Sequence, residues 1–172
     1  PRQANTTCDL NSVDQPENTM QAPDEGLSLV LIALGRGTQN YTCANETAAP
    51  AAIGALAQLF NGSCAVANNE LGSIAEDAAA IGMHFFVDNT TPDFDIIGLG
   101  NTELKRVETA AAPAATDVPW LRLEAQEAGT TSPVKEIYRL NTQGGVAPSS
   151  CTGQTAGGVV TVDYEAQYWV YA

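Results

Sequence analysis

The sequence predicts a mainly β protein, an antiparallel β-sandwich or β-barrel with one short helix and an irregular N-terminal arm. The clearest sign is the stretch 159–171, where Val160, Val162 and Tyr164 begin one face of an alternating strand and Thr161 belongs to the other. Roughly eight to ten short segments with strand character run along the chain, with turn residues between them. Because helical periodicity is confined to one segment, packed or closed antiparallel sheets are favoured.

The first part of the chain is expected to be an arm followed by strands. Residues 1–26 are polar and contain several Pro, Asn and Gln, so we expect an irregular arm there and a single β domain over residues 27–172. Residues 27–34 are an apolar run between two glycines, which is typical of a buried strand. Residues 37–43 alternate with period two, and this alternation places Asn40 on the outward face.

The middle of the chain is more ambiguous. Residues 51–60 are rich in alanine, which favours a helix, but they precede an Asn-Gly turn, which favours a strand. Residues 68–80 carry apolar side chains at i, i+3, i+4 and i+7 and predict an amphipathic helix. The other strands are expected over residues 81–87, 94–99, 102–107, 118–123, 134–141 and 159–171.

The charge of the chain excludes several classes of protein. The 172 residues include 7 Lys or Arg and 20 Asp or Glu, which gives a formal net charge of −13. Seven scattered bases cannot form the basic surface that binds nucleic acid or lies on an anionic membrane. The longest near-apolar run, residues 27–34, is far shorter than the roughly 20 residues of a membrane-spanning helix. We therefore expect a globular domain whose partners are neither nucleic acid nor membrane.

The four cysteines indicate two disulfide bonds. None of them forms a Cys-X-X-Cys pair, and with a single histidine the chain has too few soft ligands for a typical zinc site. An even number without metal spacing favours disulfides in an oxidising compartment. Four cysteines allow three pairings. We predict Cys43–Cys64, which closes a short loop between neighbouring elements, and Cys8–Cys151, which would attach the arm to the Gly-rich loop before the last strand.

Glycosylation sequons indicate the same environment. The Asn-X-Ser/Thr pattern occurs in polar or turn contexts, where an acceptor would be exposed. The chain also begins at Pro1, without a Met or an apolar leader. We therefore expect a mature, secreted, extracellular glycoprotein whose signal peptide has been removed. The candidate N-glycan acceptors are Asn5, Asn40, Asn45, Asn61 and Asn89.

Sequence motifs give little sign of catalysis. The segment with Gly98 and Gly100 begins like a dinucleotide-binding fingerprint, but its third glycine is missing and no βαβ unit surrounds it, so no cofactor is expected. His84 is the only histidine, so any Ser-His-Asp or Cys-His mechanism would have to use it. Its position in an apolar strand favours a buried structural histidine, with catalysis or copper binding as the alternatives.

Charged residues provide further candidates. Asp93 and Asp95 stand at i and i+2 in an extended segment, so their carboxylates point to one side. This arrangement suits glycosidase-type catalysis or calcium binding, with turn capping and solvation as the plainer interpretation. Arg139 lies inside a predicted strand of a chain that has few bases. We therefore expect it to form a structural ion pair with a carboxylate, and contact with an anionic ligand is the alternative.

Aromatic residues complete the set of candidates. Trp120, Trp169 and Tyr171 have flat faces that suit stacking on a sugar, although ordinary core packing is favoured. The candidate ligand-binding residues are Arg139, Asp93, Asp95, His84, Trp120 and Tyr41.

Five stretches, considered together, connect the chain with a known family. They read GRGTQNYTC over residues 35–43, TPDF over 91–94, VPWLRL over 118–123, YRLNTQGGVAP over 138–148 with Cys151 shortly after, and YEAQYW over 164–169. Their order and spacing resemble the secreted family catalogued as domain of unknown function 3455, which is common in fungi, and the similarity runs from about residue 27 to residue 171. The resemblance implies a fungal extracellular glycoprotein and supplies no catalytic residues. Some members carry a malate dehydrogenase label, which the incomplete fingerprint gives no physical reason to accept.

Two functions remain open from the sequence. The favoured one is a non-enzymatic secreted β protein that is associated with the cell wall or binds an extracellular ligand such as carbohydrate. The alternative is an acid-active extracellular hydrolase that uses carboxylates near Asp93, Asp95 and Arg139. A cleft with two facing carboxylates, one of them buried, would favour the hydrolase.

Overall fold

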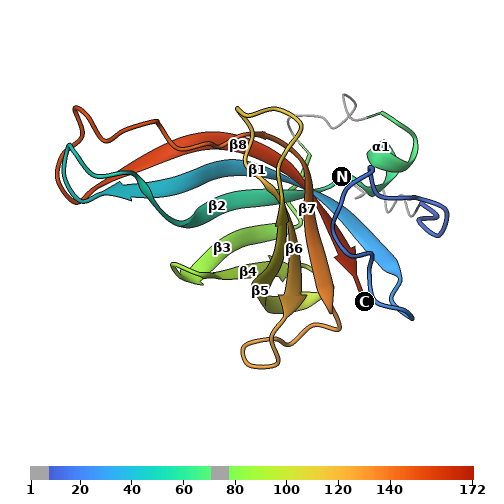
Figure 1. Cartoon of the computed structure of the whole chain (residues 1–172). Coiled ribbons are helices and arrows are strands. Elements are labelled where there is room, and N and C mark those ends of the chain that lie inside the picture. Colours follow the sequence, from blue (N-terminus) through green and yellow to red (C-terminus); the bar gives the residue numbers. More distant parts are fainter. Residues whose placement is uncertain (1–7, 71–77) are drawn as a thin grey trace.

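The protein is an eight-stranded antiparallel β-barrel with one short helix, within the residues 8–70 and 78–172 that the computed structural model describes (Figure 1). The mainly β prediction is confirmed, and of the two predicted architectures the barrel is the one observed. Each strand pairs with the next in sequence, and β8 pairs with β1 to close the sheet. The elements are β1 (Leu29–Cys43), β2 (Ala51–Asn61), α1 (Ser63–Ala67), β3 (Gly82–Asp88), β4 (Thr91–Ile96), β5 (Gly100–Ala110), β6 (Trp120–Ala125), β7 (Glu136–Gly144) and β8 (Gly158–Tyr171).

The long strands β1 and β8 close the barrel. Their pairing continues to Cys43, which lies opposite Gly158, and together with β2 they extend beyond the other strands (Figure 1, left). The two strand segments that the sequence predicts on either side of Gly35 form one continuous strand. A Cβ atom on Gly35 would lie 2.6 Å from the ring of Tyr168, so a glycine at this position lets β1 run past the tyrosine.

The ambiguous alanine-rich stretch is a strand, β2. Ala55, Ala57 and Leu59 are buried, whereas Leu56 between them is 48% exposed. This period-two burial outweighs the helix propensity of alanine because each inward side chain packs inside the barrel.

The predicted helix over residues 68–80 falls largely on residues 71–77, which lie outside the described residues. The described residues on its two sides, 68–70 and 78–80, are not helical. The short helix α1 (Ser63–Ala67) lies earlier, directly after β2.

The two faces predicted for the last strand are confirmed. Tyr164, Tyr168 and Val170 pack inside the barrel, whereas Trp169 and Tyr171 lie in a second hydrophobic cluster on its outer face. One alternating strand therefore supplies both cores, as expected for a strand that is covered on both sides.

Residues of the N-terminal arm cover this outer face. Leu10 and Met20 pack in the same cluster as Trp120, Trp169 and Tyr171, and the three aromatic residues are 6%, 1% and 7% exposed, respectively. Of the two interpretations of these aromatic residues, core packing is therefore the one observed, and a sugar does not reach their faces.

A buried charge network attaches the arm to the barrel. Arg122 of β6 donates a hydrogen bond to Glu136 at 2.9 Å and lies 3.5 Å from Asp24 of the arm. Arg122 also donates to the Tyr138 hydroxyl, which in turn donates to the backbone oxygen of Gln21 at 2.7 Å. The arm is thus fixed by charge-assisted hydrogen bonds as well as by apolar contacts.

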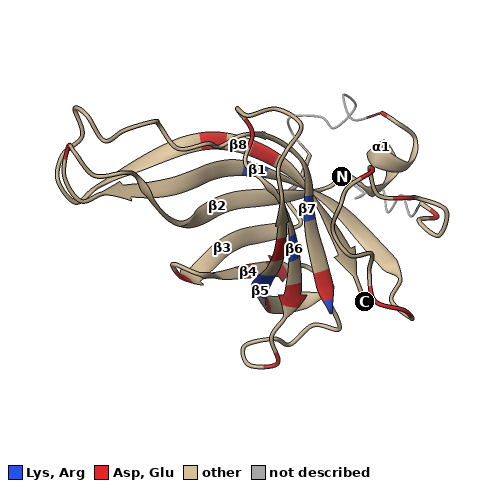
Figure 2. Cartoon of the chain, in the orientation of Figure 1, with Lys and Arg blue, Asp and Glu red and all other residues tan. Residues whose placement is uncertain are grey.

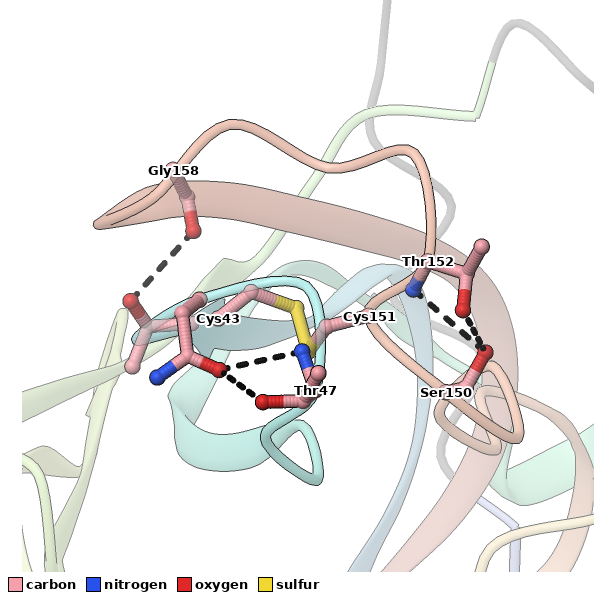
Figure 3. The surroundings of a disulfide bond; sticks show 8 residues. Cys43, Thr47, Ser150, Cys151, Thr152 and Gly158 are labelled. Atoms are coloured by element: carbon pink, nitrogen blue, oxygen red, sulfur yellow. Dashed lines mark hydrogen bonds between the residues drawn. A yellow bond between two sulfur atoms is a disulfide. The ribbon is translucent and has the colours of Figure 1, made fainter.

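All four cysteines are paired, as predicted, but the predicted pairing is wrong. The disulfides are Cys8–Cys64 and Cys43–Cys151. In the β1–β2 hairpin Ala33 lies opposite Asn61, so Cys64 follows the end of β2 that is far from Cys43. Cys43 instead lies beside the loop that leads into β8, where Cys151 reaches it (Figure 3). The sequence places these cysteines on strands and loops but does not show which ends of the strands meet.

The disulfides and the exposure of the predicted glycan acceptors bear on the predicted oxidising compartment. The two disulfides suggest a protein that is not cytoplasmic. Among the predicted glycan acceptors, Asn45, Asn61 and Asn89 are exposed, Asn40 is half-buried, and Asn5 lies outside the described residues. No helix in the described part of the chain is long and apolar enough to cross a membrane.

Candidate functional site

One end of the barrel encloses a cavity of about 740 Å³ to which all eight strands contribute lining residues. Along β1 the interior changes from packed to hollow, because Leu31 and Ala33 lie in the core whereas Gln39 and Tyr41 line the cavity. On β2, Gly54 has a φ of +129°, and a Cβ atom there would lie 2.8 Å from the Phe86 ring. Eight-stranded barrels have interiors wide enough to hold one small ligand.

Arg139 is the buried cation of this cavity. It is 9% exposed, and its Nε and Nη2 atoms donate to the backbone oxygen of Pro119 at 3.0 and 2.8 Å. No Asp or Glu in the described ranges lies within 4.0 Å of it, so the predicted ion pair is not observed. The buried ion pair of the barrel belongs to Arg122 and Glu136 instead. A backbone carbonyl satisfies donors of Arg139 but does not neutralise its charge.

The cavity lining has the opposite charge balance from the whole chain. Lys105 and Arg106 of β5 line it together with Arg139, whereas no Asp or Glu of the described ranges is among its lining residues. Three of the 7 bases in the chain thus share one cavity. In Figure 2 the ribbon is blue at Lys or Arg positions on β1, β5, β6 and β7.

Tyrosine hydroxyls lie around the guanidinium. The hydroxyls of Tyr164 and Tyr168 are hydrogen-bonded to each other at 2.8 Å, and the Tyr41 hydroxyl donates to the backbone oxygen of Gly145 at 2.6 Å. Burial raises the pKa of all three phenols, and the positive charge of Arg139 opposes that rise in each. The three groups are therefore neutral hydroxyls close to a cation at neutral pH.

His84 forms a wall of the cavity. Its ring stacks on Phe94, with 4.1 Å between the ring centres, and its Nδ1 atom donates to the backbone oxygen of Asp93 at 2.9 Å. Because a carbonyl only accepts hydrogen bonds, Nδ1 carries the proton in the neutral ring and Nε2 keeps a lone pair. Burial lowers the pKa of His84 to about 4, and Arg139 acts in the same direction. At neutral pH His84 is thus an uncharged ring.

Gln39 places a donor without a partner beside the cavity. Gln39 is 9% exposed, lines the cavity, and its Nε2 atom is buried with no hydrogen-bond partner among the described residues. Buried polar atoms are rarely left without a partner.

The other residues predicted from the sequence lie elsewhere. Phe94 packs inside the barrel, so its neighbours Asp93 and Asp95 face outward. Asp93 is 1% exposed and accepts a hydrogen bond from Asn101, which also donates to the backbone oxygen of Gly129 in the β6–β7 loop. Burial raises the pKa of Asp93, whereas Asp95 is exposed.

Of the six predicted ligand-binding residues, the structure thus brings three together and separates three. Tyr41, His84 and Arg139 line the cavity, whereas Asp93, Asp95 and the buried Trp120 do not. The residues that sequence reasoning missed are Gln39, Phe86, Lys105, Arg106 and Tyr168.

The structure bears on two further kinds of site, a metal site and a dinucleotide-binding turn. No group of three or more His, Cys, Asp or Glu side chains within the described ranges could hold a metal ion. Gly98 and Gly100, with φ values of +85° and +104°, form the tight turn of the β4–β5 hairpin. The dinucleotide fingerprint needs a strand-to-helix turn of a βαβ unit, which this antiparallel hairpin is not.

The buried neutral state of His84 predicts a pH effect on stability. Below pH 6.5 the unfolded chain binds a proton at this ring that the folded protein takes up only near pH 4. Stability should therefore fall as the pH falls through this range, by about 3 kcal/mol from His84 alone. Urea unfolding at pH 7 and pH 4 checks this for the wild type and for His84→Gln. The carboxylates are the same in both proteins, so a matching pH dependence in both would contradict the prediction.

Comparison with known proteins gives one family and no individual relative. The family model described as "Protein of unknown function (DUF3455)" matches residues 23–172. No significant match was found among curated proteins or among solved structures. Because the match covers the whole barrel, the chain belongs to the DUF3455 family.

Proposed function

We propose that the protein is a secreted, non-enzymatic binding protein that holds a small organic ligand inside its barrel. The observation that carries this proposal is the cavity of about 740 Å³ lined by all eight strands. Its volume lies within the range of about 300–1,000 Å³ that is typical of small-molecule sites. A cavity at one end of a barrel whose other end is packed suits a small molecule better than a polymer chain.

The lining of the cavity favours binding over hydrolysis. A glycosidase-type mechanism requires two carboxyl groups on either side of the substrate. Among residues 8–70 and 78–172, no Asp or Glu lines the cavity, and Asp93 and Asp95 face the outside of the barrel. Asp93 is also covered by the β6–β7 loop, to which Asn101 connects it. Of the residues in the hydrolase hypothesis, Arg139 lines the cavity, but the two carboxylates do not face a ligand there.

Two features support secretion. The disulfides Cys8–Cys64 and Cys43–Cys151 are stable in oxidising surroundings. Asn45, Asn61 and Asn89 are exposed sequon residues. Asn89 also lines the cavity, so an N-glycan there would lie at its entrance.

A neutral fluorescent probe tests whether the cavity takes up small molecules. N-phenyl-1-naphthylamine should become fluorescent on binding to the protein, because its emission rises in apolar surroundings. Ala52→Trp should weaken this binding by about tenfold or more, since Ala52 lines the cavity and a bulky ring there occupies it. The matched control is Ala51→Trp, on the same strand but not part of the lining. Equal binding by the two variants, or no binding by the wild type, would contradict the proposed function.

A further inference from the structure

We propose that the ligand is an organic monoanion, a carboxylate attached to a flat apolar body, and that Arg139 and Gln39 bind its carboxylate. This inference rests on the proposed function and specifies the chemical class of the ligand.

The first reason is the uncompensated charge of Arg139. Buried charges in proteins are normally paired with an opposite charge, because burying an isolated ion is costly. Arg139 is 9% exposed, and its hydrogen-bonding partners are neutral groups, the carbonyl of Pro119 and the hydroxyl of Tyr168. The bonds to Pro119 use Nε and Nη2, and neither a carbonyl nor a neutral hydroxyl cancels the positive charge. An anion in the cavity would supply both the acceptor and the missing charge.

The second reason is the donor of Gln39. Its buried Nε2 atom makes no hydrogen bond of regular geometry in the described part of the protein, and the side chain lies beside the Tyr164 hydroxyl. Burial raises the pKa of Tyr164, and Arg139 and Gln39 both act against that rise, so the two side chains lie close to one phenol. Arg139 on β7 and Gln39 on β1 therefore direct N–H donors to the same region of the barrel. A carboxylate only accepts hydrogen bonds when it is ionised, and it has two oxygens to offer to these donors.

The third reason is the charge around the entrance. Lys105 and Arg106 are exposed, line the cavity and form no ion pair with the described residues. In a protein of net charge −13, a cavity whose described lining contains three bases and no acid attracts anions locally. Of the three bases, only Arg139 is buried. The interior of the cavity therefore offers one positive charge, which matches a ligand with one negative charge.

The fourth reason is the shape and polarity of the walls. Phe86, Leu121, Leu123 and Tyr168 line the same cavity, and the flat ring of His84 stacks on Phe94 behind it. These surfaces bind apolar or aromatic groups through burial and ring contacts. A ligand with one anionic group and a flat apolar body fits both the basic group of the cavity and its apolar walls.

The test compares two molecules of the same shape. 2-Naphthoate and 2-naphthamide share the naphthalene body and differ in the charge of the attached group. Each is titrated into wild-type protein pre-loaded with N-phenyl-1-naphthylamine, and displacement gives its Kd. We expect the carboxylate to bind at least about tenfold more tightly than the amide.

Variants assign this preference to named residues. Arg139→Gln should abolish the preference for naphthoate, and Arg139→Lys, which keeps the charge, should keep part of it. Arg106→Gln should weaken naphthoate binding about threefold at low salt, since an exposed charge is screened. Lys135→Gln is the matched control, because Lys135 is also exposed and does not line the cavity. Its naphthoate affinity should equal that of the wild type.

The outcomes separate this inference from the proposed function. In one outcome, naphthoate and naphthamide bind with equal affinity, while the neutral probe still binds and Ala52→Trp still weakens its binding. This result would overturn the inference that the ligand is an anion and would leave the proposed binding function standing. Absence of probe binding in the wild type would overturn the proposed function itself. If Arg139→Gln does not fold, the two affinities are measured with Gln39→Leu instead. Selective loss of naphthoate affinity supports the inference, and an unchanged ratio of the two affinities overturns it.

Discussion

Replacing Arg122 with methionine is expected to lower the free energy of unfolding by about 3–5 kcal/mol. Arg122 is 4% exposed and donates to Glu136, which is 1% exposed, at 2.9 Å. Burial raises the pKa of Glu136, and Arg122 opposes that rise by hydrogen bonding and by its charge. Without Arg122, the Glu136 carboxylate stays buried, and no positive charge among the described residues lies as close to it. Chemical denaturation at pH 7 measures the loss.

The control for this experiment is the ion pair of Arg36 and Glu165. Its N–O distance is also 2.9 Å, but the two side chains are 34% and 44% exposed. Because solvent screens exposed ion pairs, Arg36→Met should cost less than about 1 kcal/mol. A loss as large as that of Arg122→Met would show that burial is not what distinguishes the two pairs. The double variant Arg122→Met/Glu136→Gln should recover part of the loss, since it removes the buried charge as well.

Removing the Cys43–Cys151 disulfide is expected to cost about 4–5 kcal/mol. The two cysteines are 108 residues apart in sequence and both are 0% exposed. In the chain-entropy description, a cross-link that closes a loop of about 100 residues stabilises the folded state by about 4.7 kcal/mol. Cys43→Ala/Cys151→Ala, compared with the wild type by denaturant unfolding without reductant, measures the effect. A loss below about 1 kcal/mol would contradict it.

Thiol titration of double variants separates the observed pairing from the one predicted by sequence. Cys43→Ala/Cys151→Ala leaves Cys8 and Cys64, which pair, so the unfolded protein should show no free thiol. Cys43→Ala/Cys64→Ala leaves Cys8 and Cys151, which belong to different disulfides, so two free thiols are expected. The opposite result would restore the pairing predicted from the sequence.

The cysteines also show which parts of the fold were predictable. Alternation along 37–43 and 159–171 correctly predicts strands, because it reflects which side chains face the core. The pattern within one strand does not encode which strand lies beside it or where the two ends meet. The continuation of β1 through Gly35 puts Cys43 and Cys64 at opposite ends of the β1–β2 hairpin, and only the assembled sheet shows this. The choice between sandwich and barrel depends in the same way on the pairing of β1 with β8.

The candidate site was predictable as single residues but not as a set. His84 and Arg139 attract attention because one is the only histidine and the other is an Arg inside a strand. Their proximity arises from barrel closure. Lys105 and Arg106 were missed because they are adjacent and would normally face opposite sides of a strand. Both nevertheless line the cavity, next to the register shift of β5 between Arg106 and Glu108.

The change from packed to hollow along β1 has a consequence for how such a protein can diversify. Leu31 and Ala33 belong to the packed end, which holds the strands together, while Gln39 and Tyr41 belong to the hollow end. Substitutions at the hollow end remove little of the apolar burial that stabilises the fold. If the proposed binding function holds, new ligand preferences can be acquired at one end of the barrel while the other end preserves the architecture. Selection can then act on affinity and on foldability largely separately.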